Sequence, residues 1–285
     1  MPSSADSADA ESGSLHQDEI AEPKAIMLKV LPAAGVALSA FLLFGVMVGW
    51  PGHVVLVASL VAAYLVDRAL FKDLLLIGVG ISIVSTTSVE ADISWPKFFL
   101  LGFVLGSAVV VPVAIDRFVY RRKAIRFPWF TGRRWTRLQW AYVVAVPLLG
   151  WLVLPFYFIH SGAYLNWPPI QTPSEFGRFF VGVNSVGLWD ELFFICICFS
   201  LLRRHFPLWL ANLLQATIFV SFLWELGYRE WGPALTIPFA LLQGYIFTKT
   251  KSLTYVVIIH LLFDAVVFFA IVHAHDRSTF RFFIY

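Results

Sequence analysis

The stretch Leu253–Val272, LTYVVIIHLLFDAVVFFAIV, carries a histidine and an aspartate, His260 and Asp264, inside 20 predominantly apolar residues. An α-helix needs about 20 such residues to cross the hydrocarbon core of a bilayer. Because His260 and Asp264 are four positions apart, a helix would place both side chains on one face. The stretch is therefore predicted to be a membrane-spanning helix with a polar pair near its middle.

The composition of the whole chain agrees with this reading. Of its 285 residues, 59% are hydrophobic and 14% are charged, whereas soluble domains carry about 25% charged residues. These values exclude an ordinary soluble globular protein. We predict an all-α, polytopic integral membrane helical bundle of about nine transmembrane helices, with eight possible because the second apolar run is short. The apolar runs lie near 26–49, 52–66, 72–89, 96–115, 138–159, 179–202, 208–226, 234–248 and 253–272.

The chain divides into four parts. Residues 1–25 are rich in Ser, Ala and acidic residues, which predicts a disordered cytoplasmic tail. N-terminal transmembrane helices are expected over 26–159, and a second group, 179–272, carries polar residues within its spans. Residues 273–285 are expected to form a C-terminal tail.

The basic residues predict the orientation. With the N-terminus in the cytoplasm, the inner segments hold 16 Lys and Arg and the outer segments hold 5, in keeping with the positive-inside rule. Eight of these basic residues lie in the loop 116–137. One interpretation is that this loop binds anionic lipid or nucleic acid. We favour a topology-fixing loop that lies on the membrane lipids, with no nucleic-acid partner.

Acidic residues inside the apolar runs are the candidates for chemistry. A charged side chain at mid-membrane depth costs about 2.5–3.5 kcal/mol on insertion scales, so Asp190, Glu191 and the His260/Asp264 pair are functional candidates. Asp190 and Asp264 are each 11 residues from the end of their predicted spans, so both are expected near the midplane. Structural pairing of these residues is the alternative. Glu225, near the outer end of its run, fits an interfacial acid in an aromatic belt as well as a catalytic one.

The polar residues of the C-terminal half occur in an order that resembles the CPBP family of intramembrane proteases, the CAAX-processing and bacteriocin-processing proteins also called Abi. The resemblance covers about residues 179–270. The family's glutamate pair followed by arginine corresponds to Asp190–Ile195, DELFFI, and its last motif, a histidine with an aspartate four positions later, corresponds to His260 and Asp264. The middle motif aligns Phe219 with a phenylalanine and Leu223 with a histidine.

This resemblance implies a helical bundle with a polar chamber and an endopeptidase that hydrolyses a peptide bond of a membrane-associated or lipidated protein or peptide. Asp190 and Glu191 would activate water, His260 would position it, and Asp264 would orient His260. Two chemistries stay open. One is a metalloprotease with a divalent metal such as zinc, held by His260 and Glu191, and the other is a glutamic-type endopeptidase.

The departures from the motifs support alternatives. Ile195 replaces the family's arginine and Leu223 replaces its histidine, and Glu225 would substitute for that histidine only in an irregular helix. A catalytically inactive relative that binds a membrane peptide or partner protein is therefore the second hypothesis. A proton-coupled transporter is the third, and the lack of paired repeats disfavours it.

Overall fold

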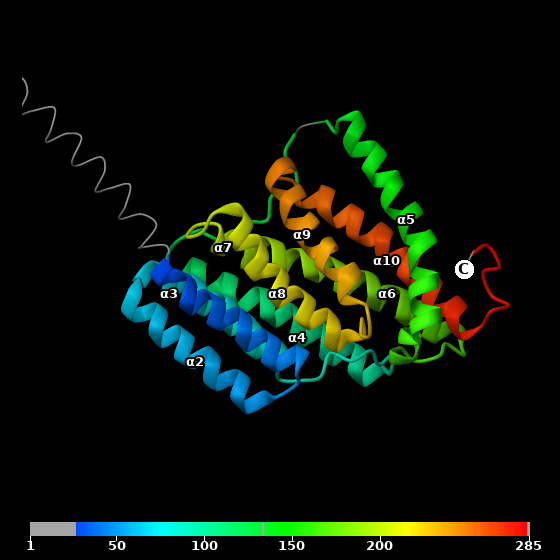
Figure 1. Ribbon diagram of the computed structural model, residues 1–285, viewed down its shortest axis with the longest axis horizontal. Helices are drawn as coiled ribbons and strands as arrows, with labels where there is room; N and C mark the ends of the chain where they lie inside the picture. Colours follow the sequence, from blue (N-terminus) through cyan, green and yellow to red (C-terminus); the bar gives the residue numbers. More distant parts are fainter. Residues whose placement is uncertain (1–26, 133, 284–285) are drawn as a thin grey trace, which may run out of the picture.

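The computed structural model describes residues 27–132 and 134–283, which contain helices and no strands (Figure 1). The predicted tail 1–25 lies outside these residues. The first helix, Met27–Gly45, ends in the π-helical segment η1 (Phe41–Gly45). It is followed by α2 (Gly49–Val66), α3 (Arg68–Val84), α4 (Trp95–Ala114) with η2 (Ile115–Val119), α5 (Arg137–Ser161), η3 (Ala163–Asn166), α6 (Pro173–Asp190), η4 (Glu191–Phe199), α7 (Ser200–Leu202), α8 (Leu208–Leu226), α9 (Pro233–Thr250) and α10 (Leu253–His275).

The all-helical membrane bundle predicted from the sequence is confirmed. Within the described ranges the segments form nine helical runs, and seven of these are long and apolar enough to cross a membrane. The other two are α3 and α9. Helix α3 has 17 residues and includes Arg68, Lys72 and Asp73, while α9 carries Gln243 and other polar residues. These polar residues make both helices less apolar than their neighbours, and two of them, Asp73 and Gln243, are buried.

Local sequence explains where several helices begin and end. Capping boxes start α5, at Thr136 and Gln139, and α6, at Thr172 and Glu175, so that side chains satisfy backbone N–H groups left free by the helix. Helix α5 ends at Gly162, which adopts a left-handed conformation with φ 75°.

The helices pack around α8 and the run formed by α6, η4 and α7 (Figure 1). Helix α8 packs against α9, η4 and η1, and α10 packs against α5 and α6. Helices α2 and α5 lie at opposite ends of the bundle. Helix α4 lies beside α6, which brings the N-terminal half of the chain against the segment with the candidate site.

A buried charge network ties the two halves together. The Asp73 carboxylate is 1% exposed and binds Arg122, Arg204 at 2.9 Å and the His205 ring at 2.8 Å. Arg122 also bonds Asp116 at 2.5 Å. His205 is thus a partner of Asp73. Because Arg204 and His205 follow α7 whereas Asp73 belongs to α3, this network fixes the turn before α8 to the N-terminal helices.

We predict that Asp73→Asn destabilises the bundle by about 1–3 kcal/mol, because it removes the charge of the buried carboxylate that Arg122, Arg204 and His205 share. The measurement is the thermal unfolding midpoint of the purified protein in detergent. The matched control is Glu90→Gln, which breaks the Arg229–Glu90 pair at 2.7 Å, whose acid side chain is 57% exposed. Surface pairs contribute less than about 1 kcal/mol, so equal shifts in the two variants would contradict a structural role for the Asp73 network.

Candidate active site

Asp190 and Glu191 lie at a break in helix geometry. Asp190 is the last residue of α6, and Glu191 is the first residue of the π-helical segment η4. Such segments are rare and often occur at functional sites. Consecutive residues of a helix project about 100° apart, so the two carboxyl groups leave the helix in different directions. They can therefore lie on two sides of one partner.

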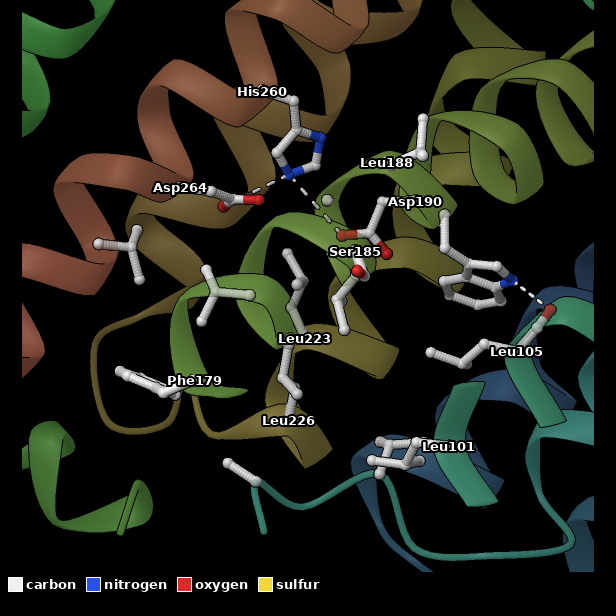
Figure 2. A pocket seen from close by; sticks show the side chains of 18 of the residues that line it. Leu101, Leu105, Phe179, Ser185, Leu188, Asp190, Leu223, Leu226, His260 and Asp264 are labelled. Carbon is white, nitrogen blue, oxygen red and sulfur yellow. Dashed lines mark hydrogen bonds and ion pairs between the residues drawn. The ribbon is translucent and has the colours of Figure 1, made fainter. Parts of the chain in front are cut away.

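That partner is the imidazole of His260 from α10. Its Nδ1 lies 2.7 Å from Glu191 Oε1, which is a hydrogen bond. Its Nε2 lies 3.7 Å from Asp190 Oδ2, an ion-pair distance (Figure 2). His260 is 4% exposed, Asp190 is 2% exposed and Glu191 is 0% exposed. Two carboxyl groups from adjacent residues thus face the two nitrogens of one buried ring.

Asp264 completes the cluster from the next turn of α10. Its Oδ1 lies 3.8 Å from His260 Nε2, on the side that also faces Asp190 (Figure 2). Gly187 on α6 makes this possible. A Cβ atom at Gly187 would lie 1.9 Å from Asp264 Oδ2 and 3.2 Å from His260 Cδ2. The absence of a side chain at this position allows α6 to approach α10 closely.

Gln243 of α9 is a further member of the cluster, beyond the residues singled out from the sequence. Its Nε2 donates to Glu191 Oε1 at 2.6 Å and to the Val256 carbonyl at 3.3 Å. Gln243 is 1% exposed. Glu191 Oε1 thus accepts hydrogen bonds from both Gln243 and His260, which fixes its position. An amide within an otherwise apolar helix was the available signal, since buried polar side chains must find partners.

The cluster borders an apolar cavity of about 440 Å³. Asp190, His260 and Asp264 line it, whereas Glu191 does not. The remaining wall is mainly aliphatic and aromatic and comes from both halves of the chain (Figure 2), including Leu101 and Leu105 of α4, Phe179 and Leu188 of the α6 run, and Phe239 and Phe263. Four of the lining residues are exposed, so the cavity opens at the surface between α4, with the loop before it, and α6: Asp92, Gly102, Gly106 and Ser185.

The structure therefore brings together four of the five residues that the sequence singled out. Glu225 is the exception. Its Oε1 accepts a hydrogen bond from the Val89 backbone N–H at 3.1 Å, on the loop between α3 and α4. Among the described residues it does not line the cavity that His260 lines. In this arrangement Glu225 does not take the place of the missing histidine. Glu225 instead holds the loop between α3 and α4 in place.

The two residues that depart from the family motifs both lie in apolar surroundings. Ile195, at the position of the arginine, is 0% exposed. Leu223, at the position of the histidine, is 6% exposed and lines the same cavity as Asp190 and His260. Next to Ile195 in the chain, Phe194 stacks on Phe219 with ring centroids 4.4 Å apart. Apolar packing thus surrounds the place where polar groups would otherwise be expected.

A divalent metal held by His260 and Glu191 fits this geometry poorly. Zinc sites in enzymes use three protein ligands with an open fourth position. Within residues 27–132 and 134–283, no group of three His, Cys, Asp or Glu side chains is arranged to hold a metal ion. The two expected ligands are hydrogen-bonded to each other, and Glu191 Oε1 also accepts from Gln243. No step of the proposed reaction therefore uses a metal.

Comparison with known proteins found a similar family. Residues 172–266 match the family model described as type II CAAX prenyl endopeptidase Rce1-like. The match confirms the resemblance to the CPBP family and covers about a third of the chain. We call 172–266 the Rce1-like segment. It contains α6 to α9 and the first part of α10, and therefore all four clustered residues. No curated protein and no solved structure matches the chain.

We predict that Gly187→Ala disrupts the cluster, because the new Cβ would force the Asp264 carboxyl group away or separate α6 from α10. Overpacking of this kind costs about 1–3 kcal/mol. The thermal unfolding midpoint in detergent should fall accordingly. In Gly182→Ala, on the same helix, the added Cβ meets no atom within 4 Å. That control should keep or raise the midpoint, since Ala favours helix over Gly by about 1 kcal/mol. Equal midpoints for both variants would contradict the close approach.

Proposed function

We propose that this chain is an intramembrane endopeptidase that hydrolyses a peptide bond of a membrane-associated or lipidated protein. One observation carries the proposal: two adjacent acids flank a single buried histidine at the wall of an apolar cavity that opens between helices. The match of the Rce1-like segment to a family of CAAX prenyl endopeptidases supports the same class of activity.

The hydrogen bond that Glu191 accepts from His260 assigns a role to each nitrogen of the ring. A carboxylate can only accept, so Nδ1 carries a proton. In the neutral ring Nε2 is then an acceptor, and it is the nitrogen nearest Asp190 and Asp264. In this proposal Glu191 is a positioning residue that sets the tautomer, in place of the role first expected for Asp264. Asp190, His260 and Asp264 face the cavity and are the residues that meet substrate.

The reaction can be written with these groups. A water molecule bound beside Asp190 and His260 gives a proton to the carboxylate or to Nε2 while its oxygen attacks the substrate's peptide carbonyl carbon. A tetrahedral intermediate forms. The proton then passes to the peptide nitrogen, the carbon–nitrogen bond breaks, and a carboxylic acid and an amine leave. General acid–base transfer of this type contributes about 10²- to 10⁴-fold to rate.

The cavity favours an apolar substrate. Its opening between α4 and α6 lies among helices long enough to cross a membrane, so a substrate anchored in lipid would reach it from the bilayer. A prenylated peptide ending in a CAAX sequence combines a hydrocarbon chain with a peptide bond, and the description of the matching family names this substrate class. We therefore take a farnesylated CAAX peptide as the test substrate.

A non-catalytic binding protein is the second candidate, and Leu223 favours it. This leucine lines the cavity where the family has a histidine, so one polar group that could act on substrate is replaced by a hydrocarbon side chain. Such a protein would bind the same membrane peptide without cleaving it. Binding and cleavage must therefore be measured separately.

We predict that His260→Ala and Asp190→Asn lower kcat for the farnesylated peptide at least 100-fold in protein that still folds and unfolds cooperatively. Glu191→Gln should also lower kcat, because the amide can donate to Nδ1 and so favour the wrong tautomer. The measurement is cleavage by the full chain reconstituted in liposomes. Glu225→Gln is the matched control and should cleave like the wild type.

Three results of this experiment would count against the proposal. Cleavage at the wild-type rate by His260→Ala would remove the catalytic assignment. Peptide binding without cleavage by the wild type would favour the non-catalytic candidate. Loss of cleavage on treatment with a chelator, restored by zinc, would replace the metal-free route with metal chemistry.

A cavity-narrowing variant tests where the substrate lies. The added Cβ of Gly106→Leu would meet no atom within 4 Å, so the new side chain can enter the cavity without a clash near the backbone. We expect a rise of at least tenfold in KM for the farnesylated peptide with an unchanged unfolding midpoint. Gly177→Leu is the control, since this position is equally open but does not line the cavity. Equal KM values in both variants would exclude this part of the cavity from substrate binding.

A further inference from the structure

Thr236 of α9 has a buried hydroxyl group without a partner. The residue is 6% exposed and lines the cavity shared by Asp190 and His260. Its Oγ1 has no hydrogen-bond partner within the described residues. A buried polar group left in this state destabilises the fold, and each such group in a native structure calls for an explanation.

Other hydroxyl groups on α8 and α9 find a hydrogen-bond acceptor within their own helix. They donate to the carbonyl four residues earlier, as Thr217, Ser221, Thr248 and Thr250 do. Thr236 does not follow this pattern. The carbonyl four residues before it, that of Gly232, already accepts the backbone N–H groups of Thr236 and Leu235, each at 2.9 Å. The Thr236 hydroxyl therefore stays available to a molecule in the cavity.

The position of Thr236 along α9 relates it to the candidate active site. Gln243, seven residues later on the same face of α9, binds Glu191. Between them, Phe239 packs its ring edge-on to His260 with centroids 4.9 Å apart. Thr236 precedes Phe239 by three residues, about 4.5 Å along the helix axis. One face of α9 thus binds Glu191 through Gln243. About two turns earlier, the same face presents the Thr236 hydroxyl to the cavity.

We propose that Thr236 is a substrate-positioning residue whose hydroxyl donates a hydrogen bond to a backbone carbonyl oxygen of the bound peptide. A peptide that enters an apolar cavity loses the water that solvated its carbonyl groups, so a donor in the wall restores one of these bonds. Nearby, the Trp189 indole N–H is already committed to the Leu105 carbonyl at 2.7 Å. The proposal rests on the proposed function in that it takes the ligand to be a peptide, although it does not require cleavage.

The test compares Thr236→Val, which keeps the shape and removes the hydroxyl, with Thr236→Ser, which keeps the hydroxyl. The probe is a fluorescent farnesylated CAAX peptide, and the full chain is used in detergent micelles. We expect Thr236→Val to raise the Kd from fluorescence anisotropy, and the KM where cleavage occurs, roughly tenfold. Thr236→Ser should stay within about threefold of the wild type. Thr248→Val, which removes a hydroxyl satisfied within its own helix, is the matched control and should leave Kd unchanged.

Thermal unfolding separates positioning from a structural role. Thr236→Val removes an unpartnered hydroxyl, so its unfolding midpoint without peptide should equal or exceed that of the wild type. A lowered midpoint together with weak binding that Thr236→Ser does not rescue would overturn the proposal in favour of a structural role. Wild-type Kd in Thr236→Val would overturn it whether or not the chain cleaves. If the wild type binds but does not cleave, and Thr236→Val binds more weakly, positioning by Thr236 stands while the endopeptidase function fails. Absence of peptide binding by the wild type would overturn both.

Discussion

The rest of the site depends on one constraint: several acidic side chains contact the same imidazole, that of His260, inside the membrane bundle. Three carboxyl groups lie close to His260, and each is almost fully buried. Carboxyl groups cannot be removed from water at this depth without partners that offset the loss of solvation. Glu191 is held by two donors, whereas one oxygen of Asp190 has no partner within the described residues. Glu191 Oε2 also lacks a partner among these residues, but of the two acids only Asp190 lines the cavity.

Several features of the neighbouring helices follow from this constraint. The helical run from α6 into η4 supplies two acids that diverge around the ring, and Gly187 lets that run approach α10. Helix α9 contributes Gln243 on one turn and Thr236 on another. The surrounding Phe and Leu side chains make the wall of the cavity apolar, and a low local dielectric strengthens electrostatic interactions. The same apolar wall suits the lipid-linked peptide that we propose as substrate.

The N-terminal half contributes more than a scaffold. Residues of α4 and of the loop that precedes it line the cavity, and Gly102 and Gly106 border its opening. Glu225 reaches this loop through Val89, and Asp73 of α3 binds Arg204 and His205 at the turn before α8. The Rce1-like segment is thus held on both sides by helices outside the family match. Under the proposed function, variation in α4 would change substrate preference without altering the acidic cluster.

The sequence by itself determined that the chain is a helical membrane protein, because length and hydropathy of each run depend only on local composition. It also selected Asp190, Glu191, His260 and Asp264, since an ionisable residue inside an apolar run is costly wherever the run packs. It could not decide which acid binds which nitrogen, because that depends on the angle between α6 and α10 and on the space at Gly187. The partners of Glu225, His205 and Gln243 come from helices far apart in the chain, so only tertiary packing decided them. For the same reason, the exposure of the Thr236 hydroxyl to the cavity followed from how α9 is rotated against its neighbours, which no local pattern specifies.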